Sequence, residues 1–99
     1  MDLMMDKFEF AGFEPDRDLK RAISRTLEMI LGSAPSDAEP VACLTRTREG
    51  FSAVLRLTSQ QGLFLAEAVG LDPAETIARL KDRIFEQITS WRSLRRAAQ

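Results

Sequence analysis

The stretch that decides the fold reads Phe51-Ser-Ala-Val-Leu-Arg-Leu-Thr58 and continues, after Ser59-Gln-Gln-Gly62, as Leu63-Phe-Leu-Ala-Glu-Ala-Val69. In its first half, apolar residues alternate with residues of mixed character. Phe51, Ala53, Leu55 and Leu57 share one face, whereas Ser52, Val54, Arg56 and Thr58 share the other. This alternation is typical of a strand with one buried face, and the short polar link indicates a hairpin. We therefore predict a sheet that is covered by helices on one face and meets water or a partner on the other.

Two further strands precede this hairpin. Residues 41–48 form a run of strand-favouring residues that reaches the hairpin through Glu49-Gly50. Residues 7–11, Lys-Phe-Glu-Phe-Ala, alternate charged and apolar side chains before a glycine, which predicts a short edge strand. The sheet is thus expected to have four strands.

Two amphipathic helices complete the pattern. The first is expected to open at Glu14-Pro15-Asp16 and to end at Gly32, with proline in its first position. Its apolar stripe consists of Leu19, Ile23, Leu27 and Ile30. In the second helix Asp72 is the expected N-cap, Pro73 the first residue and Glu75 the partner in a capping box. Its apolar stripe consists of Ile77, Leu80, Ile84, Ile88 and Trp91.

The predicted order is β-α-β-β-β-α, an α+β fold in which a four-stranded sheet has both helices packed on one face. Ninety-nine residues correspond to one domain, spanning 1–99, with residues 1–6 and 93–99 expected to fray. Hydrophobic residues make up 44% of the chain, which is enough for a globular core and too much for a disordered chain.

The composition argues against an enzyme. The chain contains no histidine, so it lacks the commonest metal ligand and the commonest general base near neutral pH. Cys43 is the only cysteine and is expected to be a small buried residue without a disulfide or metal role. The two common glycine-rich phosphate-binding motifs, G-x-x-x-x-G-K and G-x-G-x-x-G, are both absent from the sequence. We predict no catalytic residue, no metal, no cofactor and no small-molecule substrate.

The sequence also predicts a cytoplasmic location. Its longest apolar runs fall well short of the roughly 20 residues that cross a bilayer. The first residues, Met-Asp-Leu-Met-Met-Asp, are acidic where a secretory signal has a basic start. We expect no membrane partner and a monomer.

Charge is distributed unevenly along a chain whose net charge is −1. Residues 1–15 carry four acidic groups and one lysine, whereas residues 76–99 carry six basic and two acidic groups. This asymmetry favours an anionic partner, although a solvated helix face with a basic tail explains it as well.

Three stretches resemble the ribosome hibernation-promoting and ribosome-associated inhibitor proteins of bacteria. They are Phe8-Glu-Phe-Ala-Gly12 with the helix that follows, Glu49-Gly-Phe51 with the hairpin up to Gln61-Gly62, and Leu65-Ala-Glu-Ala68 with Asp72-Pro-Ala-Glu-Thr-Ile77 and the last helix. The resemblance covers nearly the whole chain, in the manner of a short-form, divergent member. It implies a fold similar to a double-stranded RNA-binding domain and a non-enzymatic factor for stress conditions. Such a factor binds ribosomal RNA on the small subunit near the decoding region and silences translation.

The resemblance also suggests which residues contact RNA. Lys20 and Arg83 match positions at which the family is usually basic. Thr26, Met29, Glu86 and Ser90 stand where the family is often basic, and Ala74 stands where an aromatic residue is common. The missing charge has moved to neighbouring arginines or the RNA role has weakened. The candidate RNA-binding residues are Lys20, Arg21, Arg25, Arg79, Arg83 and Arg92.

Other interpretations stay open from the sequence alone. A protein-interaction module of the same fold, without RNA binding, would use its open sheet face or an edge strand to bind a partner. A third possibility is an RNA or single-strand binder outside the ribosome. Trp91 is expected to anchor the core, with a base-stacking platform as its alternative.

Overall fold

The computed structural model describes residues 8–97, and side chains up to Arg95. Four strands and two helices follow one another in the predicted order β-α-β-β-β-α, which confirms the fold class. They are β1 (Phe8–Ala11), α1 (Arg17–Ser33), β2 (Glu39–Arg46), β3 (Phe51–Ser59), β4 (Gly62–Gly70) and α2 (Pro73–Ala97). The predicted start of the first strand at Lys7 and the fraying of residues 1–6 lie outside the described residues.

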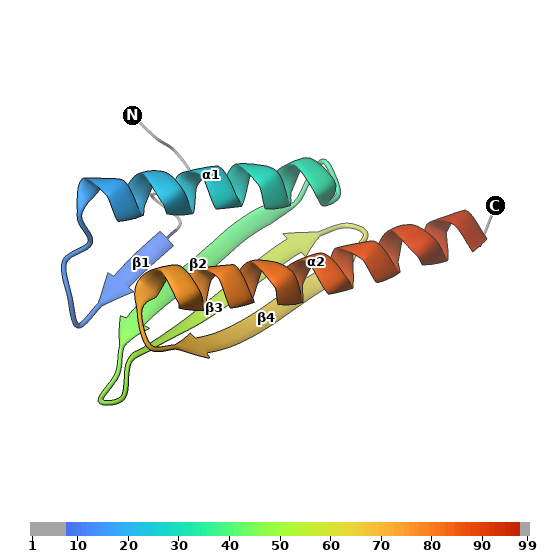
Figure 1. Cartoon of the computed structure of the whole chain (residues 1–99). Helices are drawn as coiled ribbons and strands as arrows, with labels where there is room; N and C mark the ends of the chain where they lie inside the picture. The colour runs from blue at the N-terminus through green and yellow to red at the C-terminus, as the bar shows by residue number, and fades with distance from the viewer. Residues whose placement is uncertain (1–7, 98–99) are drawn as a thin grey trace.

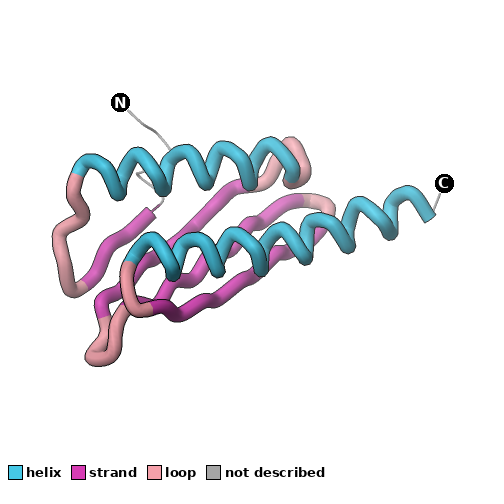
Figure 2. The backbone as a smooth tube through the Cα atoms, in the orientation of Figure 1, coloured by secondary structure: helices cyan, strands magenta, loops and turns pink. Residues whose placement is uncertain are grey.

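The strands form one sheet in the order β1-β2-β3-β4, so β1 and β4 are its two edges. β1 runs parallel to β2 because α1 carries the chain back between them, whereas the two hairpins make the other pairs antiparallel. Both helices run in the same direction over one face of the sheet, and the other face is left open (Figure 1). The tube in Figure 2 shows these two layers and the short links between them.

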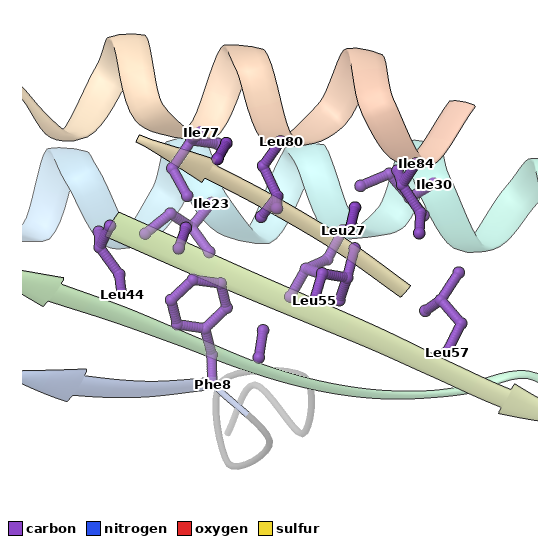
Figure 3. Close-up of a cluster of buried hydrophobic side chains, with 14 of the residues drawn as sticks. Phe8, Ile23, Leu27, Ile30, Leu44, Leu55, Leu57, Ile77, Leu80 and Ile84 are labelled. Atoms are coloured by element: carbon purple, nitrogen blue, oxygen red, sulfur yellow. The ribbon is translucent and has the colours of Figure 1, made fainter. Parts of the chain in front are cut away.

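The core lies between the helices and the covered face of the sheet (Figure 3). The apolar residues predicted for the inner face of β3 are buried there, except Phe51, which is partly buried. The helical stripes meet them with Ile23, Leu27 and Ile30 from α1 and with Ile77, Leu80, Ile84 and Ile88 from α2. Each buried aliphatic side chain contributes about 1.5–3 kcal/mol relative to an exposed one. This contribution explains why alternation and helical spacing sufficed to predict the layers.

The ends of α1 differ from the prediction. Asp16 is the N-cap, and its carboxylate accepts a hydrogen bond of 2.8 Å from the Leu19 amide. Pro15 therefore precedes the cap and is not the first helical residue. Gly32 lies inside the last turn, and the helix ends at Ser33 because the cap residue Ala34 turns to an extended conformation before Pro35. A residue that precedes proline is sterically disfavoured in the helical region, which places the end here.

The start of α2 confirms the predicted capping box in a modified form. The Glu75 amide donates to the Asp72 carboxylate over 2.8 Å, while the Glu75 carboxylate accepts from the Leu71 amide over 3.1 Å. The helix then continues to Ala97, past residue 93, where we expected it to fray. Twenty-five residues at about 1.5 Å each exceed the length of β4, so the last turns extend beyond the sheet (Figure 1).

Cys43 corrects another expectation. Its neighbours Ala42 and Leu44 point into the core, so the Cys43 side chain points to the open face, where it is only partly buried. Its thiol lies 3.3 Å from the Thr45 hydroxyl, at hydrogen-bond distance for sulfur. The alternation of β2, in which Cys43 stands between two buried residues, fixes this orientation.

Two glycines give opposite predictions for stability. A methyl group at Gly70 would lie 2.5 Å from the Thr76 hydroxyl and 2.9 Å from its amide nitrogen, where β4 passes the first turn of α2. Gly70→Ala should lower the free energy of unfolding by about 1–3 kcal/mol. Gly32 has open space in a helical turn, so Gly32→Ala should raise it by about 0.4–1 kcal/mol. Urea unfolding of both variants measures the difference, and equal effects would contradict this account of the β4–α2 contact.

Candidate nucleic-acid interface

The six candidate RNA-binding residues do not form one continuous surface. Lys20 lines a hollow with Phe8, Phe10 and Phe13, so it faces the β1 edge of the molecule. Arg79 and Arg83 bond to β4, the opposite edge. The sheet therefore separates these two groups by its full width.

Arg21 and Arg25 are one helical turn apart on α1 and both are exposed. Because Ile23, Leu27 and Ile30 occupy the sheet side of the helix, these two arginines project away from the core. Neither forms an ion pair, since the only one among residues 8–95 joins Arg79 to Glu75. Their guanidinium groups are thus available for an anionic ligand.

Arg79 and Arg83 form hydrogen bonds to the backbone along the edge of β4. The Arg79 guanidinium donates to the Val69 carbonyl over 2.8 Å, and the Arg83 guanidinium donates to the Glu67 carbonyl. One further turn along α2, the Gln87 amide donates to the Leu65 carbonyl and accepts from the Leu65 amide over 2.9 Å. We call these three side chains the β4 clip.

The β4 clip replaces a neighbouring strand. Outward-facing backbone groups of an edge strand are normally exposed and can pair with another chain. Here residues at i, i+4 and i+8 of α2 satisfy the carbonyls of alternate residues in β4, because one flank of a helix matches the spacing of alternate strand residues. Three carbonyls and one amide of the β4 edge are therefore already bonded within the chain, which disfavours strand addition by a partner there.

The clip reduces the charge that α2 can offer to RNA. Arg79 also forms an i,i+4 ion pair with Glu75, at 2.5 Å, so its charge is balanced. Arg83 pairs with neither Asp82 nor Glu86, but one of its nitrogens is committed to β4. Each guanidinium has five donors, so both arginines keep some directed at water.

Arg92 and Trp91 hold the far end of α2. The Arg92 side chain donates to the Ser33 carbonyl over 3.1 Å and thereby satisfies the C-terminal end of α1. Trp91 packs edge-on against Phe64, with ring centroids 6.0 Å apart, and Arg95 lies 5.2 Å from the Trp91 ring centroid. Trp91 is therefore a partly buried anchor whose ring contacts a cation, as expected for the core role.

At the positions where the sequence departs from the family pattern, the side chains are exposed or form a hydrogen bond within their own helix. Met29, Ala74, Glu86 and Ser90 are exposed, and the Thr26 hydroxyl donates to the Ala22 carbonyl over 2.9 Å. Glu86 and Ser90 also line a hollow beside Trp91 and Leu94. The outer surface of α2 thus carries Glu75, Asp82 and Glu86 and has an acidic component.

Sequence reasoning missed Gln87. The signal that could have identified it is the spacing Arg79, Arg83, Gln87 on one flank of α2, next to a strand with no successor in the sheet. Long polar side chains at this spacing can reach an exposed edge, which a count of charges does not reveal.

Neither a metal centre nor a membrane span can be assigned to the described part of the chain. Residues 8–97 contain no group of three or more cysteine, aspartate or glutamate side chains arranged to hold a metal ion. In the same range, neither helix combines the length and apolar character that crossing a bilayer requires.

Comparison with solved structures defines the class of fold. A ribosomal subunit interface protein from Coxiella burnetii matches 88% of this chain and 96% of its own length with a TM-score of 0.76, at 12% sequence identity. The N-terminal domain of Protein Y from Thermus thermophilus matches 85% of this chain and 94% of its own length with a TM-score of 0.67, at 17% identity. Both neighbours are proteins of the hibernation-promoting-factor family. The resemblance predicted from the sequence is therefore confirmed at the level of the fold.

Sequence comparison alone gives no such match. No family model matches the chain. No curated protein matches it either.

The β4 clip predicts a local loss of stability. Gln87→Met removes both hydrogen bonds to Leu65 while keeping a side chain of similar length, and should cost about 0.5–1.5 kcal/mol for each bond. Hydrogen exchange at the Leu65 amide should accelerate. Glu86→Gln is the matched control, since its exposed side chain forms no ion pair. Equal exchange at Leu65 in both variants would show that Gln87 does not protect the edge.

Proposed function

We propose that this protein is a non-enzymatic ribosome-associated factor of the cytoplasm, which occupies the small subunit near the decoding region and silences translation. The observation that carries the proposal is the fold, which agrees over 88% of the chain with a protein described as a ribosomal subunit interface protein. The β-α-β-β-β-α order and the helices on one face reproduce what the resemblance implied.

The helix α1 offers the best RNA contact. Arg21 and Arg25 are exposed on a rigid helix and have no acidic partner. Guanidinium groups bind phosphate through two parallel hydrogen bonds, and they keep their charge at all physiological pH values. Structured RNA presents a dense phosphate surface that can be recognised by shape without reading bases. Binding by α1 would place the whole domain across the channel, and occupancy alone would block it.

A second candidate function keeps the fold without RNA binding. The β4 clip and the Arg92–Ser33 bond commit three of the six candidate residues to structural contacts. The acidic residues on α2 weaken its attraction for phosphate further. A protein-interaction module would show no salt-dependent affinity for ribosomal RNA.

Charge reversal on α1 separates these functions. The double variant Arg21→Glu, Arg25→Glu should bind purified small subunits more weakly by about 1–3 kcal/mol for each lost phosphate contact. The wild-type protein should co-sediment with small subunits at low salt and dissociate as salt rises. In the double variant, the slope of log affinity against log salt should fall by about 0.7–0.9 per contact.

The control is Arg46→Glu, Arg48→Glu, which changes the net charge equally at exposed residues at the end of β2 and in the turn that follows. It should sediment almost like the wild type. If the wild type fails to sediment with small subunits at low salt, the ribosome proposal is wrong. If both double variants weaken binding equally, α1 is not the contact surface.

A further inference from the structure

The open face of the sheet carries an exposed apolar surface. Its exposed aliphatic side chains are between 38% and 63% accessible: Val41, Val54, Leu63, Leu65 and Val69. A shallow hollow of about 240 Å³ lies among them, lined in part by Cys43 and Arg56. Val41, Val54 and Leu65 line this hollow together, and exposed apolar side chains that gather in this way often mark an interaction site.

Strand register arranges this face in four rows across the sheet, which we number from the β3–β4 hairpin. Row two is Val41-Arg56-Leu65, and row three is Glu9-Cys43-Val54-Glu67. Row one ends in Leu63, and row four ends in Val69, both on β4. Among residues 8–95, four charged side chains belong to these rows, namely Glu9, Glu39, Arg56 and Glu67.

We propose that this face binds a second copy of the chain, with the two sheets packed face to face around a two-fold axis. The axis runs across the strands between rows two and three. This operation places row two of one copy opposite row three of the other, because a two-fold interface pairs residue i with j and j with i.

The rows are complementary under this operation. Arg56 of each copy lies over Val54 of the other, one strand spacing of about 4.8 Å from the facing Glu67. Leu63, 62% exposed, meets Val69, 63% exposed, and both lose contact with water. Glu9 and Glu39 lie at the margins, where they stay hydrated. Two identical ion pairs thus lie in the two central rows, next to the axis, and the Leu63–Val69 contacts lie outside them.

The area is sufficient for a reversible dimer. The four strands have 4, 8, 9 and 9 residues, and at about 3.3 Å per residue and about 4.8 Å between strands they cover roughly 500 Å² per copy, or about 1,000 Å² in total. This area lies at the lower limit of specific interfaces, which is typical of weak and reversible association. The sequence had predicted a monomer. The dimer leaves both helices exposed, so it is independent of the proposed ribosome contact.

A charge exchange between copies tests the proposal. Arg56→Glu alone and Glu67→Arg alone each create two like-charge pairs and should weaken the dimer about tenfold or more. A mixture of the two variants restores both ion pairs between unlike copies, and it should form a heterodimer with nearly wild-type affinity. Sedimentation equilibrium over a concentration series measures all three, and circular dichroism confirms that each variant is folded.

The mixture separates pairing between copies from any effect inside one copy, because only facing residues of different copies are rescued. Leu94→Asp on α2, an exposed apolar residue away from the sheet face, is the control and should leave the dimer unchanged. A wild-type chain that stays monomeric up to about 1 mM would overturn the proposal. So would weak self-association that the charge variants do not alter, or a mixture that behaves like its components. Small-subunit binding, measured separately, tests the ribosome proposal whatever these results are.

Discussion

The arrangement of polar side chains on α2 depends on how the edge of β4 is satisfied. A four-stranded sheet has two edges, and β1 is too short to expose more than a few backbone groups. β4 is long, and its alternate carbonyls would otherwise be open to another chain. Three side chains of α2 bond to them, and they project from the flank of the helix that lies next to its buried stripe. The other flanks of α2 face the core, face α1 or carry the acidic residues.

This constraint determines where positive charge can act. A count of arginines on α2 suggests a basic surface, yet Arg79, Arg83 and Arg92 each donate to a backbone carbonyl. Arg21 and Arg25 on α1 donate no such hydrogen bond to a backbone carbonyl, because α1 does not lie along the long edge strand. Among the candidate RNA-binding arginines, those without a bond to the rest of the fold thus lie on α1, the helix that makes fewer side-chain contacts with the sheet edge. The arginines of the two helices therefore differ in how far they are free to bind an anionic ligand, a difference that the sequence alone does not reveal.

The layers of the fold could be predicted from the sequence because apolar alternation and helical stripes report burial, which supplies most of the folding free energy. The Asp72–Glu75 capping box was local and was predicted equally well. The end of α1 was predicted wrongly. Gly32 was expected to end the helix, but the extended conformation of Ala34 before Pro35 ends it at Ser33. The orientation of Cys43 and the role of Gln87 required knowledge of strand register and of the edge position. Site residues on one helix share a spacing, but only the sheet order shows which edge they reach.

The two faces of the protein follow different physical rules. The helical face presents hydrated charges on α1, whose attraction for an anionic surface weakens as salt rises. The open sheet face presents aliphatic side chains around Arg56, and its association depends on excluded water and on a few facing charges. Because the core separates the two faces, a change on one need not alter the other. A dimer formed through the sheets would carry α1 on both outer surfaces, and each copy could then meet an anionic surface of its own.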